Sequence, residues 1–335
     1  MKEFGLALKK FNMTIRQIYE LAIQQGIKSD LRGTAAVGKK LQREKDKFQK
    51  LSEEQKTEYD QENLTNPYAD TRVYFGDPKK VVKRVLTGID IDTGEVMMAK
   101  YLSQHEKPID LIIAHHPMGA ALAGLGEMLE MHAELLAKYG VPITVAEGLT
   151  LPRASEVSRS VSGSNYNQAV DAAKILDLPI MSTHTVCDNL VANFLQKELD
   201  KNKSKLERVG DVLDLLKKIP EYREAIKFKA GPMLFAGSPD RYAGKIALTE
   251  ITGGTSGAKD VYEKMAASGV GTIIGMHMRE EWKQEAEKAH INVIIAGHMS
   301  SDSIGMNLFL DELEKKGIEI IPCSGLIRVK RFKKK

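Results

Sequence analysis

The chain has few cysteines and no long apolar run. Its two cysteines, Cys187 and Cys323, lie far apart and form no C-x-x-C pair, which excludes a disulfide framework and a thiolate zinc knuckle. No stretch reaches the ~18 apolar residues that a membrane-spanning helix needs. Lysines follow Met1 before an apolar segment of secretory length can form. We therefore expect a cytoplasmic protein with no membrane partner.

The charge balance is also unremarkable apart from the end of the chain. Apolar residues make up 42% and charged residues 28% of the sequence, which is typical of a globular protein. Much of the net charge of +4 lies in residues 328–335. A basic tail can bind nucleic acid, but a frayed, solvated terminus is commoner. We predict a solvated tail and do not expect a nucleic-acid partner.

Length and patterning indicate an α/β protein. A chain of 335 residues exceeds the usual size of one core, so two α/β lobes are expected. We predict an N-terminal lobe over residues 1–230 and a C-terminal lobe over residues 231–335. Beyond the turn at residues 76–78, β-branched runs alternate with helical patterns, which predicts a largely parallel sheet.

The individual elements follow from the same patterns. Strands are expected at 82–91, 111–114, 143–146, 180–182, 246–251, 272–274, 293–296 and 318–322. Helices are expected at 13–25, 122–138, 165–176, 186–199, 258–268 and 304–316. The mixed-charge run at 38–63 predicts a charged helical insertion, either one exposed helix or a helical hairpin.

The first candidate site follows the apolar run 111–114, which ends in His115, His116 and Pro117. In open α/β sheets, ligands bind just outside the carboxyl ends of strands. Adjacent side chains at a strand end diverge, so each imidazole can serve a different ion of a close metal pair. The alternative is that the histidines only cap the strand.

A second candidate follows the run 180–182, where His184 and Asp188 begin a predicted helix. A carboxylate in the first turn of a helix is favoured by the helix dipole and can bridge two cations. An ordinary helix cap is the alternative for Asp188. His184 is open to three readings: a ligand, a group that supports a ligand, or a substrate contact. Cys187 is best interpreted as a small packed residue.

The third candidate follows the run 293–296, where Gly297 precedes His298 and Asp302. A spacing of four residues places both side chains on one helical face, within reach of one ion. This is the third recurrence of a strand followed by histidine and carboxylate. Metal sites draw ligands from several strand ends, so we predict that the three converge on one crevice.

These motifs together resemble the Nif-three-like family, also called GTP cyclohydrolase type two-like dinuclear-metal proteins, of which the chain looks like a divergent member. The matching segments are the strand ending in His-His-Pro, the His-Thr-x-x-Asp segment at 184–188, the Gly-Gly-x-Ser-Gly turn at 253–257, and a late Gly-His-x-x-x-carboxylate segment. The resemblance covers most of the chain outside the charged run 38–63.

The resemblance implies two divalent metal ions and an assembly. His115, His116, Asp188 and His298 would be ligands, and Asp302 stands where the family usually has a bridging Glu. It further implies two lobes around a central metal-binding cleft, and a toroidal homohexamer. Imidazole and carboxylate ligands suit Zn, Mn, Fe, Co or Ni, and the sequence does not choose among them.

Two functions are open. The first is a metal-dependent hydrolase in which paired cations lower the pKa of a bridging water and polarise the substrate, while His184 or Glu147 handles the proton. The resemblance points to small cyclic, nitrogen-containing or phosphorylated substrates. The second is a non-catalytic protein in which metals organise a binding or regulatory surface.

Weaker signals remain outside these motifs. His277 follows a strand and would either line the cleft or pack at the strand end. His132 lies among apolar residues of a predicted helix, which favours burial in a core or interface over ligation. Arg153 and Arg159 flank a predicted loop that could approach an anionic substrate, although a solvated loop is the simpler reading.

Overall fold

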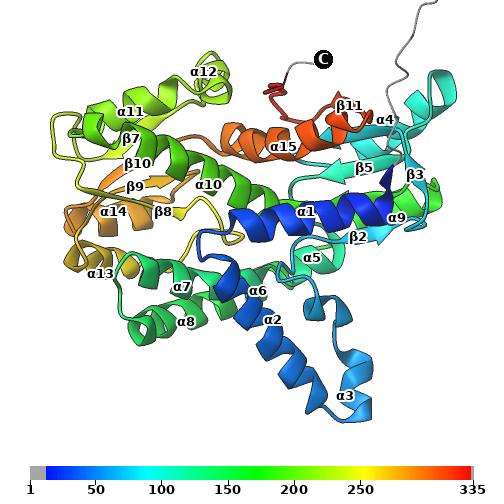
Figure 1. The fold of residues 1–335 in the computed structure, drawn as a ribbon, viewed down its shortest axis with the longest axis horizontal. Helices are drawn as coiled ribbons and strands as arrows, with labels where there is room; N and C mark the ends of the chain where they lie inside the picture. The colour runs from blue at the N-terminus through cyan, green and yellow to red at the C-terminus, as the bar shows by residue number, and fades with distance from the viewer. Residues whose placement is uncertain (1–12, 333–335) are drawn as a thin grey trace, which may run out of the picture.

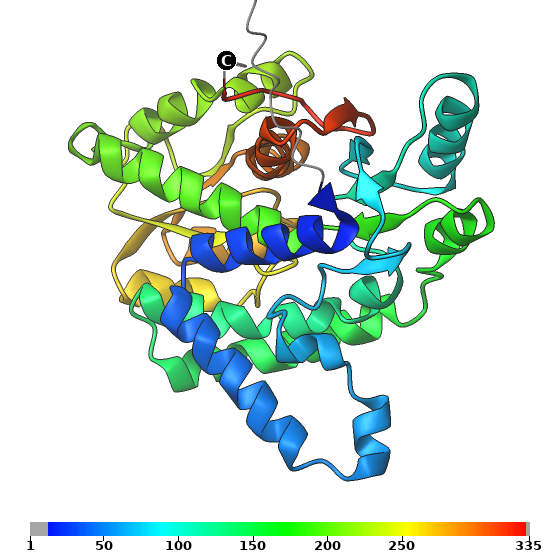
Figure 2. The same ribbon diagram turned by 45° about the vertical axis from the view of Figure 1, so that its right-hand side comes forward.

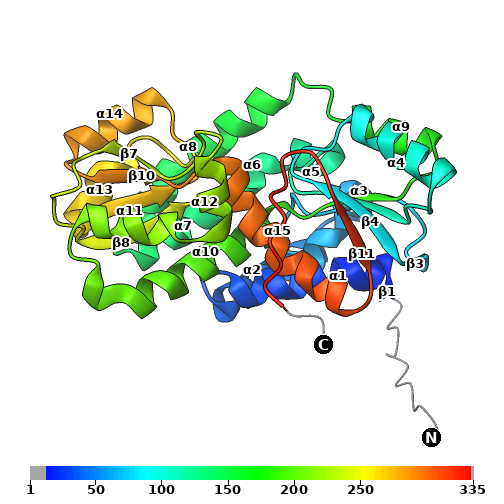
Figure 3. The ribbon, with the colours of Figure 1, turned by 90° about the horizontal axis from the view of Figure 1, so that it is seen from above.

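The structure is a computed structural model and describes residues 13–332. It contains a five-stranded sheet in the order β11-β4-β5-β6-β2 and a four-stranded sheet in the order β7-β10-β9-β8. The two sheets lie at opposite ends of the molecule, with long helices running between them (Figures 1 and 3). The predicted α/β class is confirmed.

The five-stranded sheet is parallel except at one edge. Strands β4, β5, β6 and β11 run parallel, and β2 pairs antiparallel with β6. Every residue of β4, β5 and β6 is buried, because apolar clusters cover both faces of the sheet. This explains why β5 is an unbroken apolar run in the sequence. The strands are β2 (Val73–Phe75), β4 (Arg84–Gly88), β5 (Leu111–Ala114), β6 (Ile180–Ser182) and β11 (Glu319–Pro322).

The four-stranded sheet has the same plan. Strands β8, β9 and β10 are parallel, and β7 pairs antiparallel with β10. Its strands are β7 (Met233–Ala236), β8 (Lys245–Glu250), β9 (Val270–Gly275) and β10 (Asn292–Ile295). A separate two-stranded ladder joins β1 (Met13–Thr14) to β3 (Val81–Val82).

The last strand does not lie where the predicted lobes place it. All four strands of the second sheet fall after residue 230, but β11 pairs with β4 in the first sheet. The prediction that residues 231–335 form one C-terminal lobe is therefore wrong for this strand. The chain returns because α15 (His298–Lys315) carries it back from the second sheet to the first.

The predicted strand at 143–146 is also wrong. These residues begin helix α8 (Ile143–Val161) after Pro142. The β-branched run was misleading because Ile143 and Val145 are 45% and 37% exposed, whereas the buried positions Ala146, Thr150, Arg153 and Val157 recur with the period of a helix. Arg153 and Arg159 thus lie on a helix and not on a loop.

Three helices build the centre of the molecule. Helix α1 (Ile15–Ser29) begins with a capping box between Thr14 and Gln17. It packs on α10 (His184–Asn202), which packs on α15. Gly305 of α15 permits this approach, since any side chain there would collide with the backbone of Cys187. The close contact brings Asp188 and Asp302 to the same place in the fold.

The charged segment forms a helical hairpin that projects from the body (Figures 1 and 2). It comprises α2 (Thr34–Gln49), α3 (Glu53–Glu58) and η1 (Gln61–Leu64). The other helices are α4 (Thr93–His105), α5 (Gly119–Ala123), α6 (Leu125–Met128), α7 (Glu130–Lys138), α9 (Gln168–Ile175), η2 (Lys203–Lys205), α11 (Val209–Lys217), α12 (Pro220–Ile226), α13 (Val261–Ala267) and α14 (Glu280–Lys288). No helix in the described part of the chain is long and apolar enough to cross a bilayer.

The basic end of the chain is docked and not solvated, as far as it is described. The Arg328 guanidinium donates to Asp311 and Glu314 of α15, and Arg331 donates to Glu221 of α12. Residues 333–335, which belong to the same predicted tail, lie outside the described residues. The prediction of a solvated tail is therefore wrong for the arginines, because buried carboxylates neutralise them.

Candidate metal centre

Side chains from three strand ends meet between the two sheets. His115 and His116 follow β5, and His184 begins α10 directly after the neighbouring strand β6. His298 begins α15 after β10 of the other sheet. Gly297 makes that turn with φ of 106°, and a side chain there would collide with the carbonyl of Ala230.

Asp302 divides the histidines into two groups. Its Oδ1 atom lies 3.4 Å from Nε2 of His115, which is also 3.4 Å from Oδ1 of Asp188. Its Oδ2 atom lies 3.5 Å from Nε2 of His116 and 3.5 Å from Nε2 of His298. Each carboxylate oxygen of Asp302 therefore faces a different set of potential ligands.

These distances suit ligands that share an ion. Two donors at about 2.1 Å from a tetrahedral ion are about 3.4 Å apart, which is longer than an ordinary hydrogen bond. Both side-chain oxygens of Asp302, Oδ1 of Asp188 and both ring nitrogens of His115 are buried without a hydrogen-bond partner among the described residues. Such orphaned groups are costly unless something satisfies them. The residues present therefore fit a metal site.

Two further carboxylates hold histidines of the group. Oδ1 of Asp90 lies 2.6 Å from Nδ1 of His116, and Oδ2 of the fully buried Asp70 lies 2.8 Å from Nδ1 of His184. A carboxylate on one ring nitrogen fixes the orientation of an imidazole and leaves the other nitrogen for a ligand. Nε2 of His184 points toward the centre, 3.9 Å from Oδ2 of Asp188.

Protons and cations compete for this centre. Burial lowers the pKa of His115, but the charge of Asp302 and the contacts with Asp188, Asp302 and Cys187 together outweigh it and raise that pKa well above the ordinary value. Burial raises the pKa of Asp302, yet His115 and His116 more than offset this and lower it far below its usual range. Burial lowers the pKa of His298 to about 4, so that its ring is neutral at pH 7. Metal binding at this centre would therefore compete with protonation of His115.

The opposite wall comes from the second sheet and the turn at 253–257. Glu250 at the end of β8, Ser256 and His277 line the cavity together with His298 and Asp302. Burial raises the pKa of Glu250 to about 7, against the opposing effects of the Gly257 amide and Arg153. His277 lies against His298, with ring centroids 4.8 Å apart.

The predicted residues are brought together with one exception. His115, His116, His184, Asp188, His298 and Asp302 all belong to the centre. Glu147 does not line this cavity; it lies on the exposed side of α8, because the predicted strand 143–146 just before it is the start of that helix. His132 is buried as predicted and approaches the carbonyl oxygen of Gly253.

Sequence reasoning missed Asp70, Asp90 and Glu250. Asp90 and Glu250 had a usable signal, because each lies at or just beyond the carboxyl end of a strand, where ligand-binding groups gather. Asp70 lies in the connection before β2 and carries no such signal.

Among solved structures, a NIF3 superfamily protein from Sphaerobacter thermophilus resembles this chain over most of its length. The identity is 29% and the TM-score 0.67, and the alignment covers 77% of this chain and 92% of the other. The predicted resemblance to the Nif-three-like family is thereby confirmed. Neither a family model nor a curated protein matches.

Other solved structures resemble this chain at lower identity. Reduced HcgD from Methanocaldococcus jannaschii is 15% identical with a TM-score of 0.47, over 76% of this chain and 88% of the other. A Bacillus cereus protein related to NIF3 is 12% identical with a TM-score of 0.42, over 80% and 92%. Both of these TM-scores lie below 0.5, so the resemblance rests on the Sphaerobacter protein.

Proposed function

We propose that this protein binds two divalent metal ions at the centre and hydrolyses a small substrate that is cyclic, nitrogen-containing or phosphorylated. The observation that carries the proposal is the division of ligands by Asp302. One set is His115, Asp188 and Asp302, and the other is His116, His298 and Asp302. Imidazole and carboxylate donors suit Zn, Mn, Fe, Co or Ni.

The bound ions and the side chains of the protein would have different roles in the reaction. Bound cations would supply Lewis acidity, which lowers the pKa of a coordinated water and polarises a substrate oxygen. His184 is held by Asp70 with Nε2 facing the centre, which suits a group that accepts or returns a proton. Glu250 faces the centre from the other sheet, and a carboxyl group with a pKa of about 7 can either accept or donate a proton at neutral pH.

A non-catalytic, metal-organised binding or regulatory role is the second candidate. The space beside the centre is only about 30 Å³, which leaves room for little more than a water molecule. A centre of this kind can hold ions without admitting a substrate. In that case Asp188→Ala abolishes capture of a partner protein, and there is no turnover to lose.

The homohexamer and the cytoplasmic location also belong to the proposal. The hexamer is inferred from the family, and light scattering on the purified protein tests it directly. A mass of six chains supports the assembly, and a stable monomer contradicts it.

The decisive test of the hydrolase is metal-dependent turnover. Purified protein is stripped of metal, reloaded with each of the five candidate ions, and assayed on cyclic amides, nucleotides and phosphate esters. We expect turnover that requires metal and is lost in Asp302→Asn. The matched control is Asp214→Asn, since Asp214 is exposed on α11. Full metal occupancy with no turnover across the panel would favour the non-catalytic role.

A further inference from the structure

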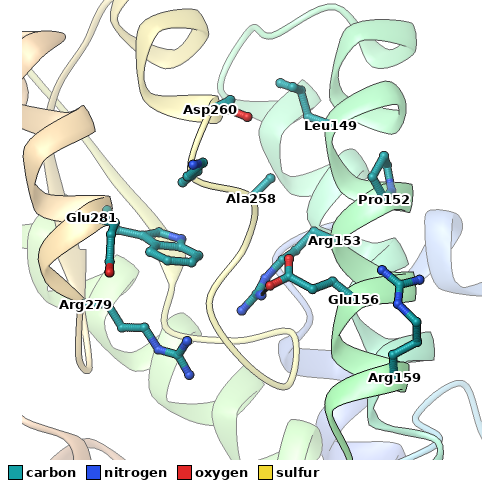
Figure 4. A pocket seen from close by; sticks show the side chains of 11 residues that line it. Leu149, Pro152, Arg153, Glu156, Arg159, Ala258, Asp260, Arg279 and Glu281 are labelled. Atoms are coloured by element: carbon teal, nitrogen blue, oxygen red, sulfur yellow. Dashed lines mark ion pairs between the residues drawn. The ribbon is translucent and has the colours of Figure 1, made fainter.

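A second, larger cavity lies next to the metal centre. It has a volume of about 600 Å³ and is bounded by α8, by the segment leading into α13, and by the start of α14 (Figure 4). Its charged lining residues are four basic and three acidic side chains: Arg153, Arg159, Lys259 and Arg279, with Glu156, Asp260 and Glu281. No step proposed for the metal centre uses this cavity.

One part of the cavity wall is the indole of Trp282, which has two guanidinium groups near its ring. The Arg153 guanidinium lies 5.2 Å from the ring centroid of Trp282, and that of Arg279 lies 5.9 Å from it. Nε1 of Trp282 donates to the carbonyl of Gly257 at 2.9 Å, which fixes the ring. Cation–π contacts of this kind hold arginine side chains in place over an aromatic face.

Two of the arginines have no carboxylate partner. Arg153 is paired with Glu156 at 2.9 Å. Arg159 and Arg279 are exposed, and among residues 13–332 neither forms an ion pair; Arg159 donates only to the hydroxyl of Ser155. Guanidinium groups held on opposite sides of a cavity offer several N–H donors to an oxyanion.

A short chain of contacts links the wall of the cavity to residues at the metal centre. Nε of Arg153 donates to the carbonyl of Ser256 at 3.2 Å, and the Ser256 hydroxyl lies 3.5 Å from Nδ1 of His277. Both Ser256 and His277 line the cavity at the metal centre. Arg279 follows His277 by two residues, so both lie in the short connection between β9 and α14.

We propose that this second cavity binds the phosphate group of the ligand on which the metal centre acts. Arg159 and Arg279 contact the phosphate oxygens from opposite sides, and Arg153 fixes Trp282 and the turn at 253–257. Phosphate is favoured over carboxylate, because three acceptor oxygens can meet guanidinium donors from opposite sides more readily than two can. That this phosphate belongs to the substrate of the metal centre rests on the proposed function, whereas phosphate binding in the cavity does not.

The single tryptophan of the chain makes the binding directly measurable. Metal-free protein is titrated with inorganic phosphate and with pyrophosphate at fixed ionic strength while Trp282 emission is recorded. We expect a saturable change in the wild type. In Arg159→Gln and in Arg279→Gln the dissociation constant rises at least tenfold. Arg223→Gln, an exposed arginine of α12 outside the cavity, leaves it unchanged.

The controls separate this site from the metal centre. Within residues 13–332 Trp282 has ring contacts with Arg153 and Arg279 but none with Arg159, so Arg159→Gln does not alter the emission through such a contact. The absence of metal removes any phosphate bound to the ions. A wild type with no saturable change, or dissociation constants that are equal in both arginine variants and the wild type, would overturn the proposal. Acetate that binds as tightly as phosphate would overturn the assignment to phosphate. Loss of hydrolysis with phosphate binding intact would count against the proposed function and not against this site.

Discussion

The carboxylate of Asp90 lies 2.6 Å from Nδ1 of His116, which leaves Nε2 of the same ring facing Oδ2 of Asp302 at 3.5 Å. Asp90 lies two residues after β4, and His116 lies two residues after the neighbouring strand β5. The pair shows that the parallel sheet supplies both the side chain that faces the centre and the group that orients it.

Removing the carboxylate of Asp90 should weaken metal binding without unfolding the protein. Asp90 is 65% exposed, so Asp90→Asn has little effect on stability. Groups that orient ligands typically contribute a factor of about 10 to 100 in metal affinity. We expect a loss of that size for one ion of the pair, measured by competition with a chelator. An equal loss for Asp214→Asn would show that the effect is not specific.

Asp302→Asn should affect both ions. Its two oxygens face separate sets of ligands, so an amide in their place removes an anionic donor from each set. We expect the metal content, measured by elemental analysis after dialysis, to fall toward zero, whereas Asp188→Asn should spare the His116 and His298 set. Retention of one full equivalent in Asp302→Asn contradicts a shared ligand.

His132 should make the protein less stable in acid. Burial lowers its pKa to about 4, although the Gly253 carbonyl opposes this effect. An unfolded histidine titrates near 6.5, so between about pH 6.5 and pH 4 only the unfolded chain takes up this proton. The contribution is fully present above pH 6.5. It is lost as pH falls, at no more than about 1.4 kcal/mol per pH unit.

The matching measurement compares His132→Gln with the wild type by denaturant unfolding from pH 7.5 to pH 4. Gln retains a donor for the Gly253 carbonyl but cannot be protonated. The difference in unfolding free energy between the two proteins should therefore shift in favour of the variant as pH falls. A difference that does not change with pH would show that the pKa of His132 is the same in the folded and unfolded states.

The docked C-terminal segment should contribute to stability. Arg331 donates to both oxygens of Glu221, which is fully buried and also accepts from Asn307. Arg331→Met leaves that carboxylate without its cation, and breaking a buried pair in this way costs about 3 kcal/mol. Adding Glu221→Gln should recover part of the loss. Arg223→Met is the control, and a similar loss there would refute a specific role for the pair.

Much of the site could be predicted because it follows buried strands. The apolar runs ending at Ala114 and Ser182 coincide with β5 and β6, and the polar residues that follow them belong to the centre. Parallel strands place their carboxyl ends at one edge, so the proximity of His115 to His184 follows from sheet geometry.

The parts of the fold and site that were not predicted depend on contacts between segments far apart in the sequence, which a local sequence pattern does not reveal. The return of β11 to the first sheet and the pairing of Asp70 with His184 join segments that are distant in sequence. The run at 143–146 was misread because β-branched residues on an exposed helical face look like a strand when read alone.

Anomalous scattering from crystals of metal-loaded protein, recorded at the absorption edge of the bound ion, tests the two-ion centre most directly. We expect two peaks, one on each side of the Asp302 carboxylate, within ligand distance of His115 and of His116 respectively. No peak beside Asp302, or a single peak shared by both histidines, would contradict it.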